Sequence, residues 1–241
     1  MLTIKNLTKH YKGSAKGVTD LSLHIAPGDL YAFIGHNGAG KTTTLKCVTG
    51  IHGFDQGEIT IGGLDIRKDP IACKKLFAYI PDNPDLYDYL TGIQYLNFIA
   101  DVFGVDADTR SKRIEEYADA YEITASLGDL ISTYSHGMKQ KLAIISALVH
   151  EPKLLILDEP FVGLDPKAAV TTKNLMRSLC ESGGAVFFST HVLEVAEKLC
   201  NKVAIIKDGS LVVAGTMEEI VKDGKTLESI FMEVVNHAEG E

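Results

Sequence analysis

"LYAFIGHNGAGKTT", residues 30–43, joins a largely apolar run to a glycine-rich loop, and a helical pattern begins where the loop ends. Residues 35–42 fit G-x-x-x-x-G-K-[ST], a loop that binds phosphate when it connects a strand to a helix. Glycines allow a tight turn, so several backbone N–H groups can point at one anion. The helix start adds the positive end of its dipole, and Lys41 adds a full positive charge. The stretch therefore predicts a buried strand that ends in a phosphate site.

Every residue of this loop is a candidate nucleotide contact, and Lys41 is also a candidate catalytic residue because its charge can lie on the outer phosphates. Thr42 additionally offers a hydroxyl to Mg²⁺, a hard cation that takes oxygen ligands. A glycine-rich turn with a chance lysine is the alternative, which the flanking strand and helix patterns disfavour. The predicted contacts are Gly35, His36, Asn37, Gly38, Ala39, Gly40, Lys41, Thr42 and Thr43.

A second motif supplies the acids that a hydrolytic site needs. In "LLILDEP", residues 154–160, Asp158 ends an apolar run and Glu159 follows it. Ligands bind at the carboxyl ends of parallel strands, so Asp158 is predicted to hold Mg²⁺ together with Thr42, directly or through water. Glu159 can orient or deprotonate the attacking water. Two acids in a solvated turn are the alternative interpretation.

A histidine closes another apolar run, "VFFSTH" at residues 186–191. If this run is a strand parallel to the one before Asp158, His191 lies on the same edge of the sheet. We predict that His191 senses the γ-phosphate and belongs to the catalytic set. An ordinary surface or core histidine is the alternative.

The fold class predicted from these runs is α/β, with a P-loop NTPase core in which helices cover both sides of a mostly parallel sheet. An antiparallel β subdomain and an all-helical insertion complete it. Runs that are apolar on both faces indicate buried parallel strands, whereas alternating runs broken by glycine or proline indicate antiparallel strands. Parallel strands are expected at 30–35, 153–158, 185–190 and 202–207, and antiparallel strands within 1–30 and 56–66.

The stretch 91–150 carries helical patterns. Thr91 can cap a first helix, with Leu96, Ile99 and Phe103 on one face. A more charged helix is expected over 109–123. We expect a single domain with a core at 1–82 and 151–215, a helical subdomain at 83–150 and a C-terminal tail at 216–241, in which "TLESIFMEVV" forms an amphipathic helix.

Composition narrows the functional classes. The 241 residues carry a net charge of −8, which disfavours a nucleic-acid-binding protein. The start of the chain lacks the apolar core of a secretory signal, and no apolar run reaches the roughly 18 residues of a membrane span. The four cysteines form no C-x-x-C pair, so reduced, packed thiols are expected. These features predict a cytoplasmic protein whose membrane role, if any, depends on a partner.

The motifs together resemble the nucleotide-binding subunit of ATP-binding cassette (ABC) transporters. Each motif alone is weak or moderate, but their order and spacing over nearly the whole chain are specific. Met138, Lys139 and Gln140 resemble the exporter branch that is often called ABC-2 type. The motifs are "HYKG" at 10–13, "GHNGAGKTT", "IPDNPD" at 80–85, "YSHGMKQK" at 134–141, "LLILDEP", "GLDP" at 163–166 and "STH" at 189–191.

The resemblance implies further nucleotide contacts. Tyr11 would stack on adenine, and Val18 would lie beside the ribose. Ser135 and Gly137 match the family signature, usually Leu-Ser-Gly-Gly-Gln, which caps the γ-phosphate of ATP held by a partner subunit. Asp165 would contact the opposite subunit. From the residues alone, Tyr11 is a strand-edge tyrosine, Ser135 a helix cap and Asp165 a turn residue before a proline.

Three positions depart from the family pattern, and one of them is Met138, which stands where the signature usually has glutamine. Asp82 stands where a glutamine usually contacts Mg²⁺ and the water, so we assign it to the metal and catalytic sets, although a carboxylate accepts hydrogen bonds and cannot donate them. Asn83 offers an amide nearby. His136 stands where the signature usually has glycine, and its side chain can either crowd the phosphate or, as an imidazolium, assist it.

The function that the resemblance implies is an ATP-binding and ATP-hydrolysing subunit that powers a membrane transporter, an exporter in this branch, through ATP-driven head-to-tail dimerisation. The cofactors would be ATP and Mg²⁺. The partners would be a transmembrane permease on a separate chain and either a second copy or a related ATPase, with no nucleic acid, at the inner face of the cell membrane. A soluble non-transport ABC ATPase and a non-hydrolysing regulatory nucleotide-binding module remain as alternatives.

Overall fold

The computed structural model describes residues 1–11, 13, 16–222 and 224–236. Its strands form two sheets, and the predicted α/β class is confirmed. The strands are β1 (Leu2–His10), β2 (Gly17–Ile25), β3 (Leu30–Ile34), β4 (Gln56–Ile61), β5 (Leu64–Asp65), β6 (Phe77–Ile80), β7 (Leu154–Asp158), β8 (Ala185–Thr190), β9 (Lys202–Lys207) and β10 (Ser210–Thr216).

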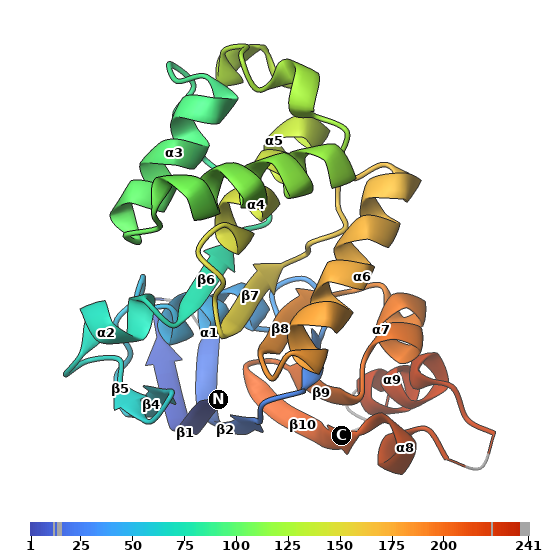
Figure 1. Cartoon of the computed structure of the whole chain (residues 1–241). Helices are drawn as coiled ribbons and strands as arrows, with labels where there is room; N and C mark the ends of the chain where they lie inside the picture. The colour runs from blue at the N-terminus through green and yellow to red at the C-terminus, as the bar shows by residue number, and fades with distance from the viewer. Residues whose placement is uncertain (12, 14–15, 223, 237–241) are drawn as a thin grey trace.

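Helices lie around these sheets, and Figure 1 shows α3, α4 and α5 gathered above the edge that carries β6 and β7. The helices are α1 (Lys41–Val48), α2 (Pro70–Lys74), α3 (Gly92–Val102), α4 (Ala107–Ala120), α5 (His136–Leu148), α6 (Pro166–Glu181), α7 (Leu193–Leu199), α8 (Met217–Ile220) and α9 (Leu227–Asn236), with 3-10 turns at Thr124–Ser126 and Ile131–Thr133.

The larger sheet has the order β10-β9-β3-β8-β7-β6, and all its pairings are parallel except that of β10 with β9. Its carboxyl-terminal edge therefore collects the ends of β3, β7 and β8, where the predicted site lies. Register places Asp158 opposite Ser189 and Ile34 opposite Thr190. The smaller sheet, β2-β1-β4-β5, is antiparallel, as predicted.

Both faces of the parallel sheet are covered, which explains why its strands are apolar throughout. Alternate side chains point to opposite faces, so Phe33 and Phe187 meet on one face with ring centroids 5.4 Å apart, while Phe188 packs on the other. One core contains α1 and the antiparallel sheet, and the other contains α5 and α6. Each fully buried phenylalanine contributes about 1.5–3 kcal/mol.

The helical stretch predicted at 91–150 is present. The Thr91 hydroxyl accepts from the Gln94 N–H at 3.3 Å, and the Gln94 side chain accepts from the Thr91 N–H at 2.9 Å, which makes a reciprocal cap. Leu96 is fully buried, whereas Ile99 and Phe103 are only half-buried. The subdomain bounds 1–82, 83–150, 151–215 and 216–241 stay predictions.

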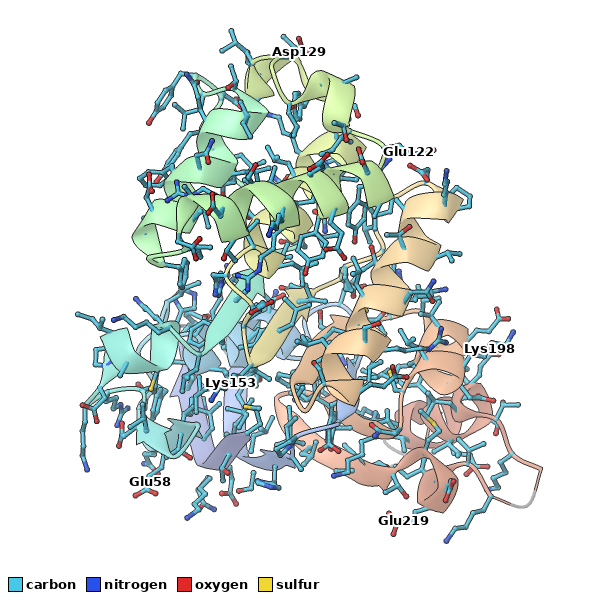
Figure 2. The ribbon with its side chains drawn as sticks, in the orientation of Figure 1. Glu58, Glu122, Asp129, Lys153, Lys198 and Glu219 are labelled. Carbon is cyan, nitrogen blue, oxygen red and sulfur yellow. The ribbon has the colours of Figure 1, made fainter. Side chains whose placement is uncertain are left out.

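The charged helix expected over 109–123 is α4. It begins earlier because Asp106 caps it, with the side chain accepting from the Thr109 N–H at 2.9 Å, and it ends at Ala120. At its end, Glu122 bonds to Lys167 in the first turn of α6, and Figure 2 shows Glu122 at this junction.

The C-terminal helix predicted in the tail is α9, which packs on α7 through buried Leu227 and Ile230. The Leu227 N–H donates to the Glu197 carboxylate at 2.7 Å, which fixes the helix start. Asp223 and residues 237–241 of the predicted tail, and Lys12 of "HYKG", lie outside the described residues. Among the described residues, none of the helices has the length and apolar character needed to cross a bilayer.

Candidate active site

A cleft of about 370 Å³ opens at the carboxyl-terminal edge of the parallel sheet. The phosphate loop forms its floor, the two acids after β7 form one wall, and two residues before β2 lie at its rim. The lining residues are Tyr11, Lys16, Gly17, His36, Asn37, Gly38, Gly40, Lys41, Thr42, Thr43, Asp82, Asp158 and Glu159. Eleven of these thirteen residues are predicted site residues.

The loop backbone requires glycine at several positions. Gly38 and Gly40 have φ of 87° and 109°, a left-handed conformation that L side chains rarely adopt. At Gly35, a Cβ would lie 2.6 Å from the Ile206 carbonyl oxygen, so only glycine fits under the loop. The resulting concave backbone, at the start of α1, has the shape and the donors that a phosphate needs.

Lys41 spans the loop. Its ammonium donates to the carbonyl oxygens of Gly35 at 2.6 Å and His36 at 3.3 Å, and it lies 3.8 Å from a Glu159 carboxylate oxygen. Burial lowers the pKa of Lys41, and the carboxylates of Glu159 and Asp158 oppose that shift. Its partly desolvated charge suits a phosphate well, because water competes less for the ammonium there.

Asp158 is held from both sides. The Thr42 hydroxyl donates to its Oδ2 at 2.7 Å, and the Ser189 hydroxyl donates to its Oδ1. Asp158 is almost completely buried, so its free lone pairs face the cleft beside the Thr42 oxygen. Two hard oxygens at a phosphate loop suit Mg²⁺, which keeps water and substrate phosphate oxygens as its other ligands.

Glu159 adopts a left-handed backbone with φ of 48°, a conformation that costs a residue other than glycine about 1 kcal/mol or more. Its N–H donates to the Ser189 carbonyl at 3.2 Å and to the Ser189 hydroxyl at 3.1 Å, which holds this backbone in place. A carboxylate oxygen of Glu159 lies 3.0 Å from His191 Nδ1. His191 does not line the cleft and is more than half exposed, so it reaches the site through Glu159.

Two predicted residues lie at the rim. Tyr11 is 36% exposed, its hydroxyl is 3.4 Å from the Thr43 hydroxyl, and the Lys9 ammonium lies over its ring at 5.5 Å from the centroid. Asp82 is exposed and accepts a hydrogen bond from the Asn83 backbone N–H at 3.0 Å. The carboxylate therefore faces the cleft as an acceptor.

Val18 lies beneath the phosphate loop. It is fully buried, and a Cβ on Gly40 would lie 3.1 Å from its Cγ2. Val18 does not line the cleft, whereas the preceding Lys16 and Gly17 do, and its contact with a ribose stays a prediction. Ala39 is buried in the same way, and Gly35 lies at the base, where its carbonyl bonds to Lys41.

Ser135, Gly137 and Asp165 do not line the cleft. Ser135 caps α5 by accepting from the Met138 N–H at 3.3 Å. Asp165 caps α6, and its carboxylate lies 2.7 Å from the Lys141 ammonium of α5. The hydrogen bond from Lys141 lowers the pKa of Asp165. These residues form a second group, at the adjoining starts of α5 and α6.

Sequence reasoning missed Ser189, Lys16 and Lys141. Ser189 lies within "STH", the motif quoted for His191, but its contact with Asp158 depends on the pairing of β7 with β8. Lys16 and Lys141 carry no sequence signal that separates them from other lysines. The fold places Lys16 at the cleft and Lys141 beside Asp165.

The ABC transporter family profile matches residues 18–162, which is more than half of the chain. The chain belongs to the ABC transporter family. The linearmycin resistance ATP-binding protein LnrL of Bacillus subtilis is 33% identical over 99% of this chain and 77% of its own length. The ABC-type transporter ATP-binding protein EcsA of Bacillus subtilis is 32% identical over 100% of this chain and 98% of its own length.

Solved structures agree with this assignment. An ATP-binding subunit of an ABC transporter superposes with a TM-score of 0.94 at 32% identity, covering 98% of this chain and all of that one. The ATP-binding cassette MJ0796, a dimer with ADP and phosphate, has a TM-score of 0.82 at 23% identity over 90% of this chain and 99% of its own, and shows the fold alone. This ABC subunit is an ATP-binding ATPase, with ATP and Mg²⁺ as the cofactors of its family.

Proposed function

We propose that the chain is the ATP-hydrolysing motor of a membrane exporter and works as a head-to-tail dimer with two Mg-ATP between its protomers. One observation carries the proposal: the predicted site residues fall into two separate groups. The cleft holds the phosphate loop, the metal ligands and Glu159, whereas Ser135, Gly137 and Asp165 lie outside it. A site that is divided in this way becomes complete when a second chain supplies the missing group.

Within the cleft, the chain's own residues would bind and orient the substrate. The loop N–H groups and Lys41 bind the phosphates, and Thr42 and Asp158 hold Mg²⁺, which neutralises charge on the phosphate oxygens. Glu159 accepts a proton from the attacking water, and His191 holds the Glu159 carboxylate in place at 3.0 Å.

From the partner, the start of α5 would bind the outer phosphate. Ser135 is exposed and offers a hydroxyl, and Gly137 offers an N–H without a side chain in the way. Both lie at the N-terminus of a 13-residue helix, where the dipole favours an anion. ATP would thus hold two protomers together, and cleavage would release them.

The transport role rests on the family and on particular relatives. LnrL is named for linearmycin resistance, and Met138, Lys139 and Gln140 resemble the exporter branch. We infer a transmembrane permease as a separate chain, contacted by the helical part at 83–150, and a cytoplasmic position at the inner face of the membrane. A related ATPase in place of the second copy is the alternative partner.

Glu159→Gln tests the hydrolytic part. The variant should bind ATP as wild type does and lose about 10²–10⁴-fold in turnover, the usual contribution of a general base. Gel filtration should show a dimer with Mg-ATP and a monomer without nucleotide. Turnover at the wild-type rate would overturn the assignment of Glu159, and a monomer at saturating Mg-ATP would overturn the homodimer.

Purification of the native chain from detergent-solubilised membranes tests the transport part. A permease subunit should accompany it in fixed stoichiometry. Recovery of the chain only from the soluble fraction, without a membrane protein, would favour the soluble ABC ATPase instead.

A further inference from the structure

His136 occupies the space above Gly163. A Cβ added to Gly163 would meet Cδ2 of the His136 ring and lie 2.8 Å from its Nε2. Gly163 has φ of 79°, so its position already favours glycine, and a side chain there would displace the exposed His136 ring from its present position. The imidazole therefore lies against the backbone of its own chain.

Two further contacts join the same segments. A Cβ on Gly137 would lie 2.7 Å from the Gly163 carbonyl oxygen, so the start of α5 lies directly on that peptide. One turn later, the Lys141 ammonium lies 2.7 Å from the Asp165 carboxylate. The first turns of α5 and residues 159–165, which we call the Glu159 loop, thus make three contacts, two at Gly163 and one at Asp165.

The Glu159 loop is short and internally bonded. The Val162 N–H donates to the Glu159 carbonyl at 3.2 Å, and the Leu164 N–H donates to the Phe161 carbonyl at 3.4 Å. Only three residues lie between Glu159 and Gly163. A shift of Gly163 would therefore displace Glu159 as well, and misplacing a catalytic group by about 1 Å can reduce a rate by about 100-fold.

We propose that His136 is a positioning residue that holds the Glu159 loop in register with the start of α5. The inference rests on the proposed function, because it joins the chain's own base to the surface that would cap the partner's nucleotide. The role comes from the shape of the ring and involves no proton transfer to phosphate. This role would explain why a histidine can stand at a signature position that is usually glycine: the ring of His136 contacts a loop of its own chain.

A double-mutant cycle tests the contact, with His136→Ala, Gly163→Ala and the double variant. Residues in contact couple by about 0.5–3 kcal/mol, which corresponds to about twofold to 150-fold in rate. We expect kcat for ATP to fall in each single variant and the double variant to be at least about twofold more active than the product of the two effects. The affinity of the monomer for ATP without Mg²⁺ should stay at the wild-type value, because His136 does not line the cleft of its own chain.

Two further variants make the readout specific. Gly183→Ala introduces the same left-handed strain at φ of 89° in open space, and it should leave kcat unchanged. His136→Gln, which keeps a flat group of similar length, should restore most of the activity. The pH profile of kcat should keep its shape in His136→Gln, because the proposed role depends on the shape of the side chain and not on its charge.

Multiplicative effects on kcat would overturn the positioning role, and so would a changed affinity of the His136→Ala monomer for ATP without Mg²⁺. A flattened pH profile in His136→Gln would assign the effect to the imidazole charge instead. Absence of turnover in the wild type at saturating Mg-ATP would overturn the proposed function. Thermal unfolding of the same four proteins would then still show whether the two residues are coupled in the fold.

Discussion

At the scale of single residues, Ser189 organises both acids of the site. Its hydroxyl donates to Asp158 and accepts from the Glu159 N–H, and its carbonyl accepts from the same N–H. One side chain therefore fixes the metal carboxylate and supports the left-handed backbone that aims Glu159. The sequence pointed to Asp158 and Glu159 because acids at the end of an apolar strand indicate a metal or catalytic site. A serine within a strand, such as Ser189, does not indicate one.

Ser189→Ala should weaken metal use more than nucleotide binding. Without its hydroxyl donor, the Asp158 carboxylate is less well oriented, and loss of such a supporting hydrogen bond typically costs about 10- to 100-fold in metal affinity or activity. We expect the Mg²⁺ concentration for half-maximal ATPase activity to rise within that range. Titration of Mg²⁺ at fixed ATP measures it, and Ser111→Ala, at an exposed position of α4, is the control. An unchanged Mg²⁺ requirement would contradict this role.

At the scale of elements, α5 connects the two parts of the fold. Its start is exposed at Ser135, whereas the residues from Leu142 to Leu148 are all buried, because α5 packs against α3, α4 and β6. Just beyond its end, His150 stacks on Phe103 at 3.6 Å, nearly parallel. Burial lowers the pKa of His150 to about 4 from its usual 6.5, so the ring is neutral when it packs.

This histidine should make the fold sensitive to acid. Below about pH 6.5 the unfolded chain binds a proton at residue 150 that the folded chain does not bind until about pH 4, so stability is lost as pH falls through that window. The loss is on the order of 2–3 kcal/mol at about 1.4 kcal/mol per pKa unit. His150→Phe keeps a flat ring, so its Tm should fall less between pH 7 and 4 than that of wild type. His24→Gln, at an exposed position of β2, should follow wild type, and equal slopes for all three would contradict the assignment.

Element prediction succeeded where a strand was apolar throughout and failed for two strands that lacked a clear pattern. The runs at 153–158, 185–190 and 202–207 are strands to within one residue, since buried parallel strands are apolar throughout. The four-residue strand β6 was not predicted, because a run that short before a proline carries little periodicity. The edge strand β10 was also missed, because it alternates and lies among glycines.

At the scale of the whole molecule, the proposed site is complete only between two chains. The cleft and the start of α5 lie on different parts of one protomer. Ser135, Gly137 and Asp165 are not among the residues that line the cleft. A symmetric head-to-tail pair would place each group opposite its complement, because a twofold axis makes the two contacts equivalent.

Mixing two inactive chains should restore activity if the site is shared in this way. Lys41→Ala removes a phosphate ligand, and Ser135→Arg blocks the capping face, so each chain alone should be inactive. In a mixed pair one site combines both defects and the other has none. Random pairing at equal amounts then gives up to about a quarter of the wild-type sites. ATPase activity of the mixture, against each chain alone at the same total concentration, measures this. Absence of any recovery would indicate that the chain requires a different ATPase as its partner.

The sequence by itself determined the features that depend on residues close together in the chain. It specified the strand, the loop and the helix start between 30 and 43, because glycine conformations and helix dipoles are local properties. It also placed Asp158, Glu159 and His191 at strand ends. The tertiary structure alone decided which of these side chains meet.

Asp158 reaches Ser189 through strand register, Val18 packs beneath the phosphate loop, and His136 lies against Gly163. Each of these contacts joins segments that are 22 or more residues apart in the sequence. Their geometry follows from sheet pairing and packing, which a sequence pattern does not contain.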